Sequence, residues 1–114
     1  MKKNIIVEKS YHFAIEMTEI SKKLKDKKEF HLASQLLRSS TSIGANVKEA
    51  TGAQSKRDFI SKMSIASKEA REANYWINLI NDSKTLDIDF SGHLKESDEI
   101  IKILTAILKT AKSG

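Results

Sequence analysis

Three side chains near the start of the chain have types and a spacing that suit metal binding. Glu8, His12 and Glu16 recur every four residues. In a helix they therefore share one face, and two carboxylates with an imidazole are ligands that a divalent metal accepts. Such rows more often form a solvated helix face, and the Glu-x-x-His pairs of di-iron bundles are absent. A metal-dependent enzyme is thus only a third hypothesis, and we predict no metal and no cofactor.

The residue types and motifs of the sequence do not indicate any other catalytic chemistry. The chain has no cysteine, which excludes disulfides, thiolate metal sites and cysteine nucleophiles. The sequence contains neither a phosphate-binding Gly-Lys-Ser/Thr motif nor a Gly-x-Ser-x-Gly elbow. Serines are numerous, but no readable motif places a base beside one. We therefore predict no catalytic residues and a protein that is not an enzyme.

The composition indicates one helical domain that spans residues 1–114. The 114 residues are 39% hydrophobic and 31% charged, which suits a soluble globular protein. With no proline and four glycines, long helices are permitted almost everywhere. The apolar run at residues 5–7 is too short for a signal peptide, and no segment is long enough to span a membrane. We expect a cytoplasmic protein whose residues 1–8 are flexible or extended.

Hydrophobic periodicity predicts four helices. The first covers residues 9–26 and the second residues 29–50, each with apolar residues spaced by three and four. The centre of the second, residues 39–45, is rich in Ser and Thr and contains Gly44, so it either breaks or allows a neighbouring helix to come close. The period continues through this segment, which favours one continuous helix.

The third helix has a clear start signal, because Ser55 and Asp58 have the spacing of a capping box. It continues to about residue 81. In the loop at residues 85–92 we expect apolar side chains to close the end of the molecule. The fourth helix begins near residue 91 or 93 and ends near residue 111. Its main apolar stripe is predicted to consist of Leu94, Ile101, Leu104, Leu108 and Ala111.

Four amphipathic helices with short links predict an all-α, antiparallel up-down-up-down four-helix bundle. The last two helices carry more apolar residues than one face requires. We interpret the excess as a contact between subunits of a homo-oligomer; the alternative is a wide core with a few exposed side chains. The predicted interface residues are Ile65, Trp76, Leu79, Ile100, Ile103 and Ile107.

The net charge of +5 is not spread evenly over such a bundle. Alternating helix directions give one end a charge of +5 and the other −1. We call the first end the basic pole and predict that it contacts phosphate groups of nucleic acid; the alternative is that its lysines only improve solubility. The predicted nucleic-acid-binding residues are Lys2, Lys3, Lys9, Lys48, Lys56, Arg57, Lys109 and Lys112.

Several blocks of sequence resemble the 23S ribosomal RNA intervening-sequence protein family. They are residues 42–50 (SIGANVKEA), 58–60 (DFI), 67–72 (SKEARE) and 75–76 (YW). The resemblance covers nearly the whole chain and implies a small cytoplasmic bacterial protein, an antiparallel four-helix bundle and a ring-shaped homopentamer. Members are often encoded inside ribosomal RNA genes, and similar accessory proteins of diversity-generating retroelements bind nucleic acid through a basic surface. Asn46 and Glu49 match the family's Asn-x-x-Glu, which we interpret as a structural link between helices or subunits; Ala50 departs from the more usual Gly.

Two hypotheses for function therefore precede the metal enzyme. The first is a non-enzymatic, oligomeric helical bundle that binds ribosomal or other structured RNA, or a nucleoprotein, through the basic pole. The second is a ring that acts as a protein-binding scaffold and has no role with nucleic acid.

Overall fold

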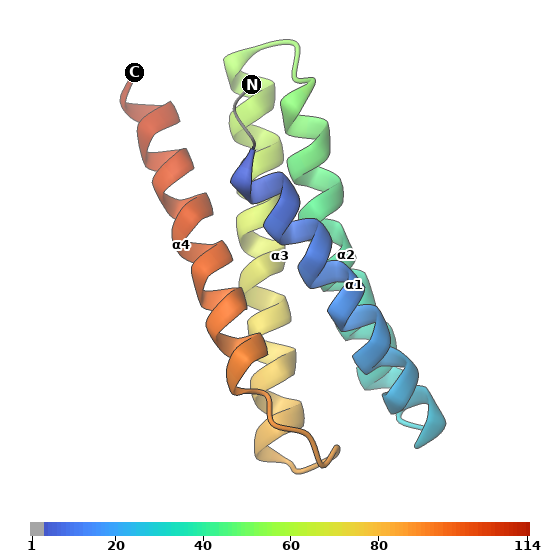
Figure 1. The fold of residues 1–114 in the computed structure, drawn as a ribbon. Helices are drawn as coiled ribbons and strands as arrows, with labels where there is room; N and C mark the ends of the chain where they lie inside the picture. The colour runs from blue at the N-terminus through green and yellow to red at the C-terminus, as the bar shows by residue number, and fades with distance from the viewer. Residues whose placement is uncertain (1–3) are drawn as a thin grey trace.

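A computed structural model describes residues 4–114 and shows four long helices in sequence order. They are α1 (Ile5–Asp26), α2 (Phe30–Thr51), α3 (Lys56–Asp82) and α4 (Ser91–Ser113). Short turns reverse the chain after each of the first two helices, and consecutive helices run antiparallel (Figure 1). The described part of the chain contains no strand, so the predicted all-α four-helix fold is confirmed.

Helix α1 begins earlier than predicted. Asn4 has extended backbone dihedrals, and its side chain accepts a hydrogen bond from the backbone N–H of Val7 at 3.4 Å. An Asn at this position satisfies one of the unpaired donors of a first helical turn, so the helix starts at Ile5. The expectation of a flexible or extended segment up to residue 8 is therefore wrong for residues 5–8. Residues 1–3 lie outside the described part.

Helix α2 is continuous through its Ser/Thr-rich centre, as predicted. The Ser39 and Ser40 hydroxyls donate to the carbonyl groups of Gln35 and Leu36, one turn earlier, at 2.9 and 2.6 Å. These bonds pair both buried hydroxyls without interrupting the helix. Gly44 faces α1, where a Cβ atom at this position would lie 3.5 Å from the Ser10 carbonyl oxygen. The small residues thus allow a close contact between helices rather than a break.

The start of α3 and the loop before α4 also agree with the sequence. Ser55 is the N-cap of α3, and its hydroxyl accepts the Asp58 N–H at 3.0 Å. In the loop, Leu86 and Phe90 are buried and Ile88 packs against the core. These side chains close the end of the bundle opposite the basic pole, as expected.

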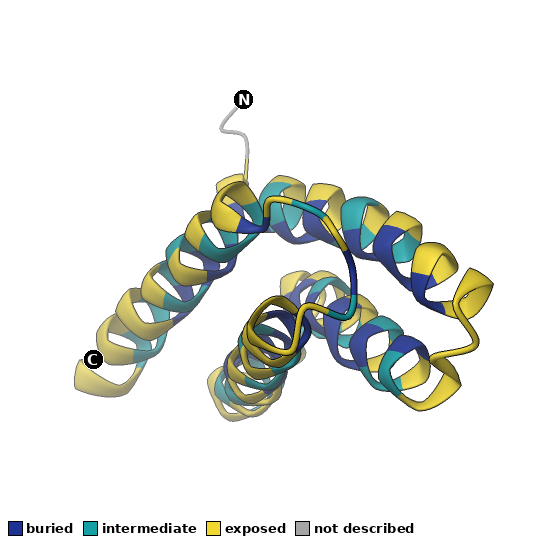
Figure 2. Ribbon diagram, turned by 90° about the horizontal axis from the view of Figure 1, so that it is seen from below, coloured by how far each residue is buried: buried dark blue, intermediate teal, exposed yellow. Residues whose placement is uncertain are grey.

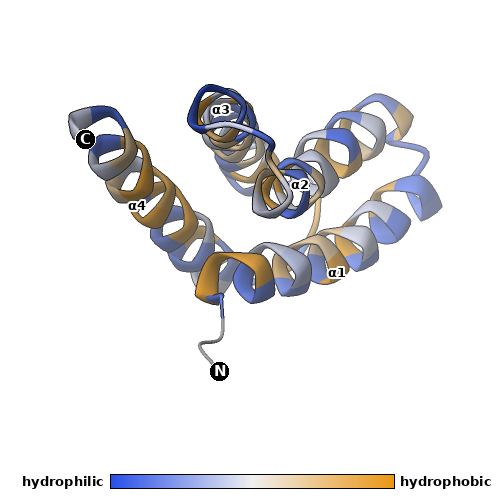
Figure 3. Ribbon diagram, turned by 90° about the horizontal axis from the view of Figure 1, so that it is seen from above, coloured by the Kyte–Doolittle hydropathy of each residue, from blue (hydrophilic) through white to orange (hydrophobic). Residues whose placement is uncertain are grey.

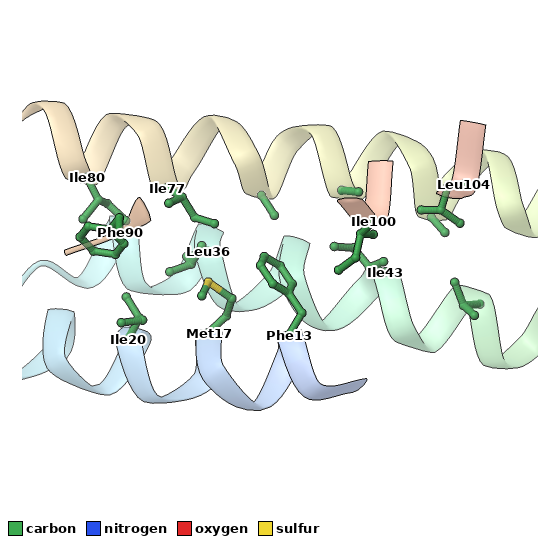
Figure 4. Packing of buried hydrophobic residues seen from close by; sticks show 14 of the residues in the cluster. Phe13, Met17, Ile20, Leu36, Ile43, Ile77, Ile80, Phe90, Ile100 and Leu104 are labelled. Atoms are coloured by element: carbon green, nitrogen blue, oxygen red, sulfur yellow. The ribbon is translucent and has the colours of Figure 1, made fainter. Parts of the chain in front are cut away.

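The core consists of apolar side chains from all four helices and from the loop before α4 (Figure 4). Its large members include Phe13, Met17, Leu36, Ile77 and Ile100. The prediction for α4 was wrong in one respect. Ile100 and Leu104 are completely buried, whereas most of the expected main stripe of α4 is only half-buried. Helix α4 is therefore rotated about its axis relative to the prediction, so that it buries a different face.

Helices α1 and α4 contact each other much less than the other neighbouring pairs do. Figures 2 and 3 show that the C-terminal half of α4 diverges from α1. This half of α4 is more exposed than the first half, and it still contains hydrophobic residues. The molecule is elongated, with extents of 46 × 25 × 21 Å. Among the described residues, none of the helices combines the length and apolarity needed to cross a membrane.

Candidate nucleic-acid interface

The basic pole is formed by the starts of α1 and α3 and the ends of α2 and α4. These four helix ends lie at the same end of the molecule (Figure 1). Six of the eight predicted basic residues belong to the described part, while Lys2 and Lys3 lie outside it. With three acidic residues at the same helix ends, the described pole has a net charge of +3. The six are Lys9, Lys48, Lys56, Arg57, Lys109 and Lys112.

Lys9 differs from the other basic residues of the pole. Its ammonium group lies 3.0 Å from the Glu99 carboxylate of α4, so its charge is already balanced. The remaining five side chains are exposed and form no ion pair within residues 4–114. These five are Lys48, Lys56, Arg57, Lys109 and Lys112. They are the side chains available to an anionic partner.

Helix polarity adds to the positive potential at α3. Lys56 and Arg57 are the first two residues of α3, at the end where unpaired N–H groups give a helix a partial positive charge. Ser55 accepts only one of these N–H groups, that of Asp58. The α3 start thus adds helix polarity to two basic side chains, although Asp58 offsets one charge.

Two surface grooves reach the pole. One, of about 540 Å³, lies between all four helix ends and includes Lys56, Phe59 and Ile107 in its wall. The other, of about 600 Å³, follows the seam of α1 and α2, where Tyr11 and Lys48 stand beside small residues. Tyr11 is 67% exposed, so its ring is free to stack with a planar group. Both grooves place an apolar surface beside an unpaired lysine.

The predicted interface residues do not all reach the surface. Ile65 and Leu79 of α3 are 40% and 38% exposed, and Trp76 between them is half-buried. Ile103 and Ile107 of α4 are half-buried, near the region where α4 leaves α1. Ile100 has no exposed surface, because it turns into the core between α4 and the other helices. Its assignment to a subunit interface is therefore incorrect.

A charged network that the sequence did not reveal crosses the seam of α2 and α3. The Arg38 guanidinium bonds to Glu69 at 2.9 Å and also to Glu72. Glu72 in turn accepts the Trp76 indole N–H at 3.1 Å. Glu69 is almost fully buried, and a buried carboxylate needs such a partner. The signal was present as two glutamates inside an otherwise apolar stripe, but nothing in the sequence paired them with Arg38.

Both residues of the Asn-x-x-Glu pair in α2 bond to groups of the same chain. Glu49 lies 3.3 Å from the Lys62 ammonium of α3 and so links two helices. The Asn46 side-chain amide donates to the Ser42 carbonyl of its own helix at 2.8 Å. Glu49 therefore fulfils the expected role as a link between helices, while Asn46 bonds to its own helix.

The row of Glu8, His12 and Glu16 is not built as a metal site. Within residues 4–114, no group of three or more histidine or acidic side chains is arranged to hold a metal ion. Glu16 instead faces α4, where its carboxylate lies 3.8 Å from His93 Nε2. Burial and the neighbouring Glu16 carboxylate raise the pKa of Glu96 to about 7. This cluster between α1 and α4 was also not foreseen, because its members are about 80 residues apart.

The comparisons with known proteins agree with the fold. The family model of the 23S rRNA-intervening sequence protein matches residues 2–106. A crystal structure of a protein of unknown function from the S23 ribosomal protein family of Bacteroides thetaiotaomicron VPI-5482 is 42% identical and has a TM-score of 0.87. The similarity covers 91% of this chain and 98% of that one. No match was found among curated proteins. The chain therefore belongs to the 23S rRNA-intervening sequence protein family.

Proposed function

We propose that this protein is a non-enzymatic, oligomeric helical bundle that binds structured RNA, or a nucleoprotein that contains it, through the basic pole. The observation that carries the proposal is the set of five exposed basic side chains, free of ion pairs in the described chain, at one end of the molecule. Phosphate groups are the polyanion that such a surface attracts, and RNA is found in the cytoplasm, where we expect the protein to act.

The surroundings of these charges support a nucleic-acid partner. The α3 start adds backbone N–H groups to Lys56 and Arg57, and helix N-termini are favourable positions for phosphate. The seam of α1 and α2 adds an exposed tyrosine ring next to Lys48. Aromatic side chains beside basic ones are typical of surfaces that bind unpaired bases.

A salt titration tests this function. We expect binding of a structured RNA, measured by fluorescence anisotropy, to weaken steeply with salt because bound phosphates release counterions. Lys56→Ala with Arg57→Ala should weaken binding and lower the slope of log K against log salt by about 2, one for each lost contact. The matched control is Lys25→Ala with Lys27→Ala, two exposed lysines at the opposite end of the bundle.

Two results would contradict the proposal. One is the absence of RNA binding even at low salt. The other is an equal loss of affinity in the control pair, which would mean that net charge alone, and not the basic pole, attracts the RNA.

A second candidate function, a ring that serves as a protein-binding scaffold, is favoured by a different observation. The α3 stripe of Ile65, Trp76 and Leu79 leaves apolar surface uncovered, and Trp is one of the residues enriched at energetically important contacts. We infer that this stripe contacts a second copy of the chain, and the family resemblance suggests five copies. The scaffold function requires the assembly but no RNA, so the salt titration separates the two candidates.

A further inference from the structure

The groove of about 600 Å³ along the seam of α1 and α2 has the size and lining of a small-ligand site. The two helices lie side by side (Figure 3), and the small residues Ala14, Gly44 and Ala45 line the space between them. Tyr11 also lines the groove and is 67% exposed. Sites for small ligands have volumes of roughly 300–1,000 Å³ and mostly apolar walls. The groove can therefore hold a flat apolar group next to the tyrosine ring.

The polar groups of the groove are few, and each has a defined hydrogen-bonding capacity. The Lys48 ammonium donates and the Glu8 carboxylate accepts. The Thr41 hydroxyl already donates to the Leu37 carbonyl at 2.6 Å, so it can only accept from a ligand. Besides the tyrosine ring, the groove thus offers one cation and two acceptors.

The two charges of the groove favour a nucleotide over a protein surface as its occupant. Within residues 4–114, neither Glu8 nor Lys48 forms an ion pair. An apolar helix face of a second copy would cover both charges without giving either a partner, which costs free energy. A nucleotide instead brings a phosphate for Lys48, N–H groups for Glu8 and a flat ring for the apolar space.

We propose, on the basis of the RNA-binding function proposed above, that this groove is a subsite for one unpaired base, which stacks on Tyr11 while Lys48 binds its phosphate. Bases inside a duplex are paired and stacked, so only a bulged or looped-out base can enter the groove. Lys48 belongs to the basic pole, which places the groove beside the surface that attracts the RNA backbone. The RNA that this protein binds is therefore a structured RNA with an unpaired nucleotide.

Glu8 and Thr41 also select among the bases. Both present acceptors, which bond to an exocyclic amino group and disfavour a carbonyl oxygen. Cytosine and uracil have the same size, but cytosine carries an amino group where uracil carries a carbonyl oxygen. The groove therefore binds an unpaired cytosine more tightly than an unpaired uracil.

Two RNA duplexes that differ only in a single bulged cytosine test the subsite. We expect the bulged duplex to bind about fivefold or more tightly than the fully paired one in fluorescence anisotropy, because one base stacks on an aromatic side chain. In Tyr11→Ala the two duplexes should bind equally, whereas Tyr11→Phe keeps the ring and the difference. Tyr75→Ala is the matched control, because it removes another exposed tyrosine, on α3, and should keep the difference.

Two further variants test the space in the groove and the choice of base. Ala45→Leu fills the groove from an exposed position of α2, where leucine favours helix, and should also abolish the difference between the duplexes. Replacement of the bulged cytosine by uracil should weaken binding to the unsubstituted protein by about two- to tenfold. Glu8→Gln, whose amide also donates to a carbonyl oxygen, should reduce this preference.

Failure of the subsite and failure of RNA binding give different results. If neither duplex binds, the RNA-binding function itself is disproved. If both duplexes bind equally, or if Tyr11→Ala keeps the difference, the subsite is disproved while RNA binding stands. Equal affinity for bulged cytosine and bulged uracil would disprove the selection by Glu8 and Thr41. A change in sedimentation of Tyr11→Ala or Ala45→Leu, with the difference between the duplexes unchanged, would show that a second copy of the chain occupies the groove.

Discussion

At the scale of single residues, most buried polar side chains in this bundle have a defined partner, although the buried Ser21 hydroxyl has none among the described residues. The hydroxyls of Ser39 and Ser40 donate to their own helix, and the Glu69 carboxylate is bonded by Arg38. Unpaired polar groups in an apolar interior cost free energy that a bundle of this size cannot easily spare. Glu69 therefore depends on the position of a neighbouring helix, whereas the two serines depend only on their own helix.

The N-cap of α3 gives a prediction at this scale. Ser55→Ala removes the hydroxyl that accepts the Asp58 N–H, and we expect the free energy of unfolding to fall by about 1 kcal/mol. Urea denaturation followed by circular dichroism measures the change. Ser61→Ala is the matched control, because Ser61 is exposed within the same helix and alanine favours helix there. Equal stability of Ser55→Ala and the unsubstituted protein would show that the cap contributes nothing.

At the scale of elements, the seam of α1 and α2 depends on small side chains. Gly44 approaches the Ser10 backbone, and the space next to it allows one more carbon atom at an ordinary contact distance of 3.5 Å. The adjacent Ala14, Thr41 and Ala45 are small as well, and the same seam carries the shallow apolar groove with Tyr11. The close approach of the two helices and the groove thus have the same origin.

Two substitutions at Gly44 test this account. Gly44→Ala fits the available space and removes the conformational freedom of glycine, so it should stabilise the protein by about 0.5–1 kcal/mol. Gly44→Leu should instead push α1 outward and destabilise by roughly 1–3 kcal/mol. Thermal unfolding of both variants measures the difference. Destabilisation by Gly44→Ala would mean that α1 and α2 are closer than the structure has them.

At the scale of the whole molecule, the bundle does not cover all of its apolar surface. The large apolar side chains that are exposed include Ile15 and Tyr11 of α1 and Ile65 and Leu79 of α3. Ile103 and Ile107 remain half-buried where α4 diverges. Surfaces of this kind on different sides of one chain are typical of subunits in a larger assembly, which is why we propose a homo-oligomer.

Sedimentation measures the proposed assembly. Trp76→Glu places a charge in the α3 stripe, and we expect the protein to sediment as a smaller species than the unsubstituted one. Because Trp76 also packs against the core, Ile65→Glu is a second variant with less effect on folding. Gln54→Glu adds the same charge to the exposed loop between α2 and α3 and should leave the assembly unchanged. Assembly that persists in both α3 variants would exclude this stripe as the contact.

Sequence periodicity predicted the four helices because burial of one helix face imposes a local pattern that repeats every three or four residues. The start of α3 was predictable for a similar reason, since a cap needs only residues three apart. The rotation of α4 was not: Ile100 and Ile101 are neighbours in an apolar run, and only contact with the other helices decides which of them turns inward. The start of α1 was not predictable in the same way, because residues 5–7 are consecutive apolar residues that show no helical spacing.

The sequence alone therefore determined the fold class and the end of the molecule where basic residues gather, which follow from local pattern, composition and helix direction. It also indicated the family, through the resemblance of several sequence blocks. The tertiary structure decided which of these basic residues are unpaired, which apolar residues face solvent, and that Glu16 meets His93 across the α1–α4 seam. The physical reason is that ion pairs, burial and shifted pKa values depend on distances between residues far apart in the chain. Those distances are set by how the helices pack and not by the pattern along any one of them.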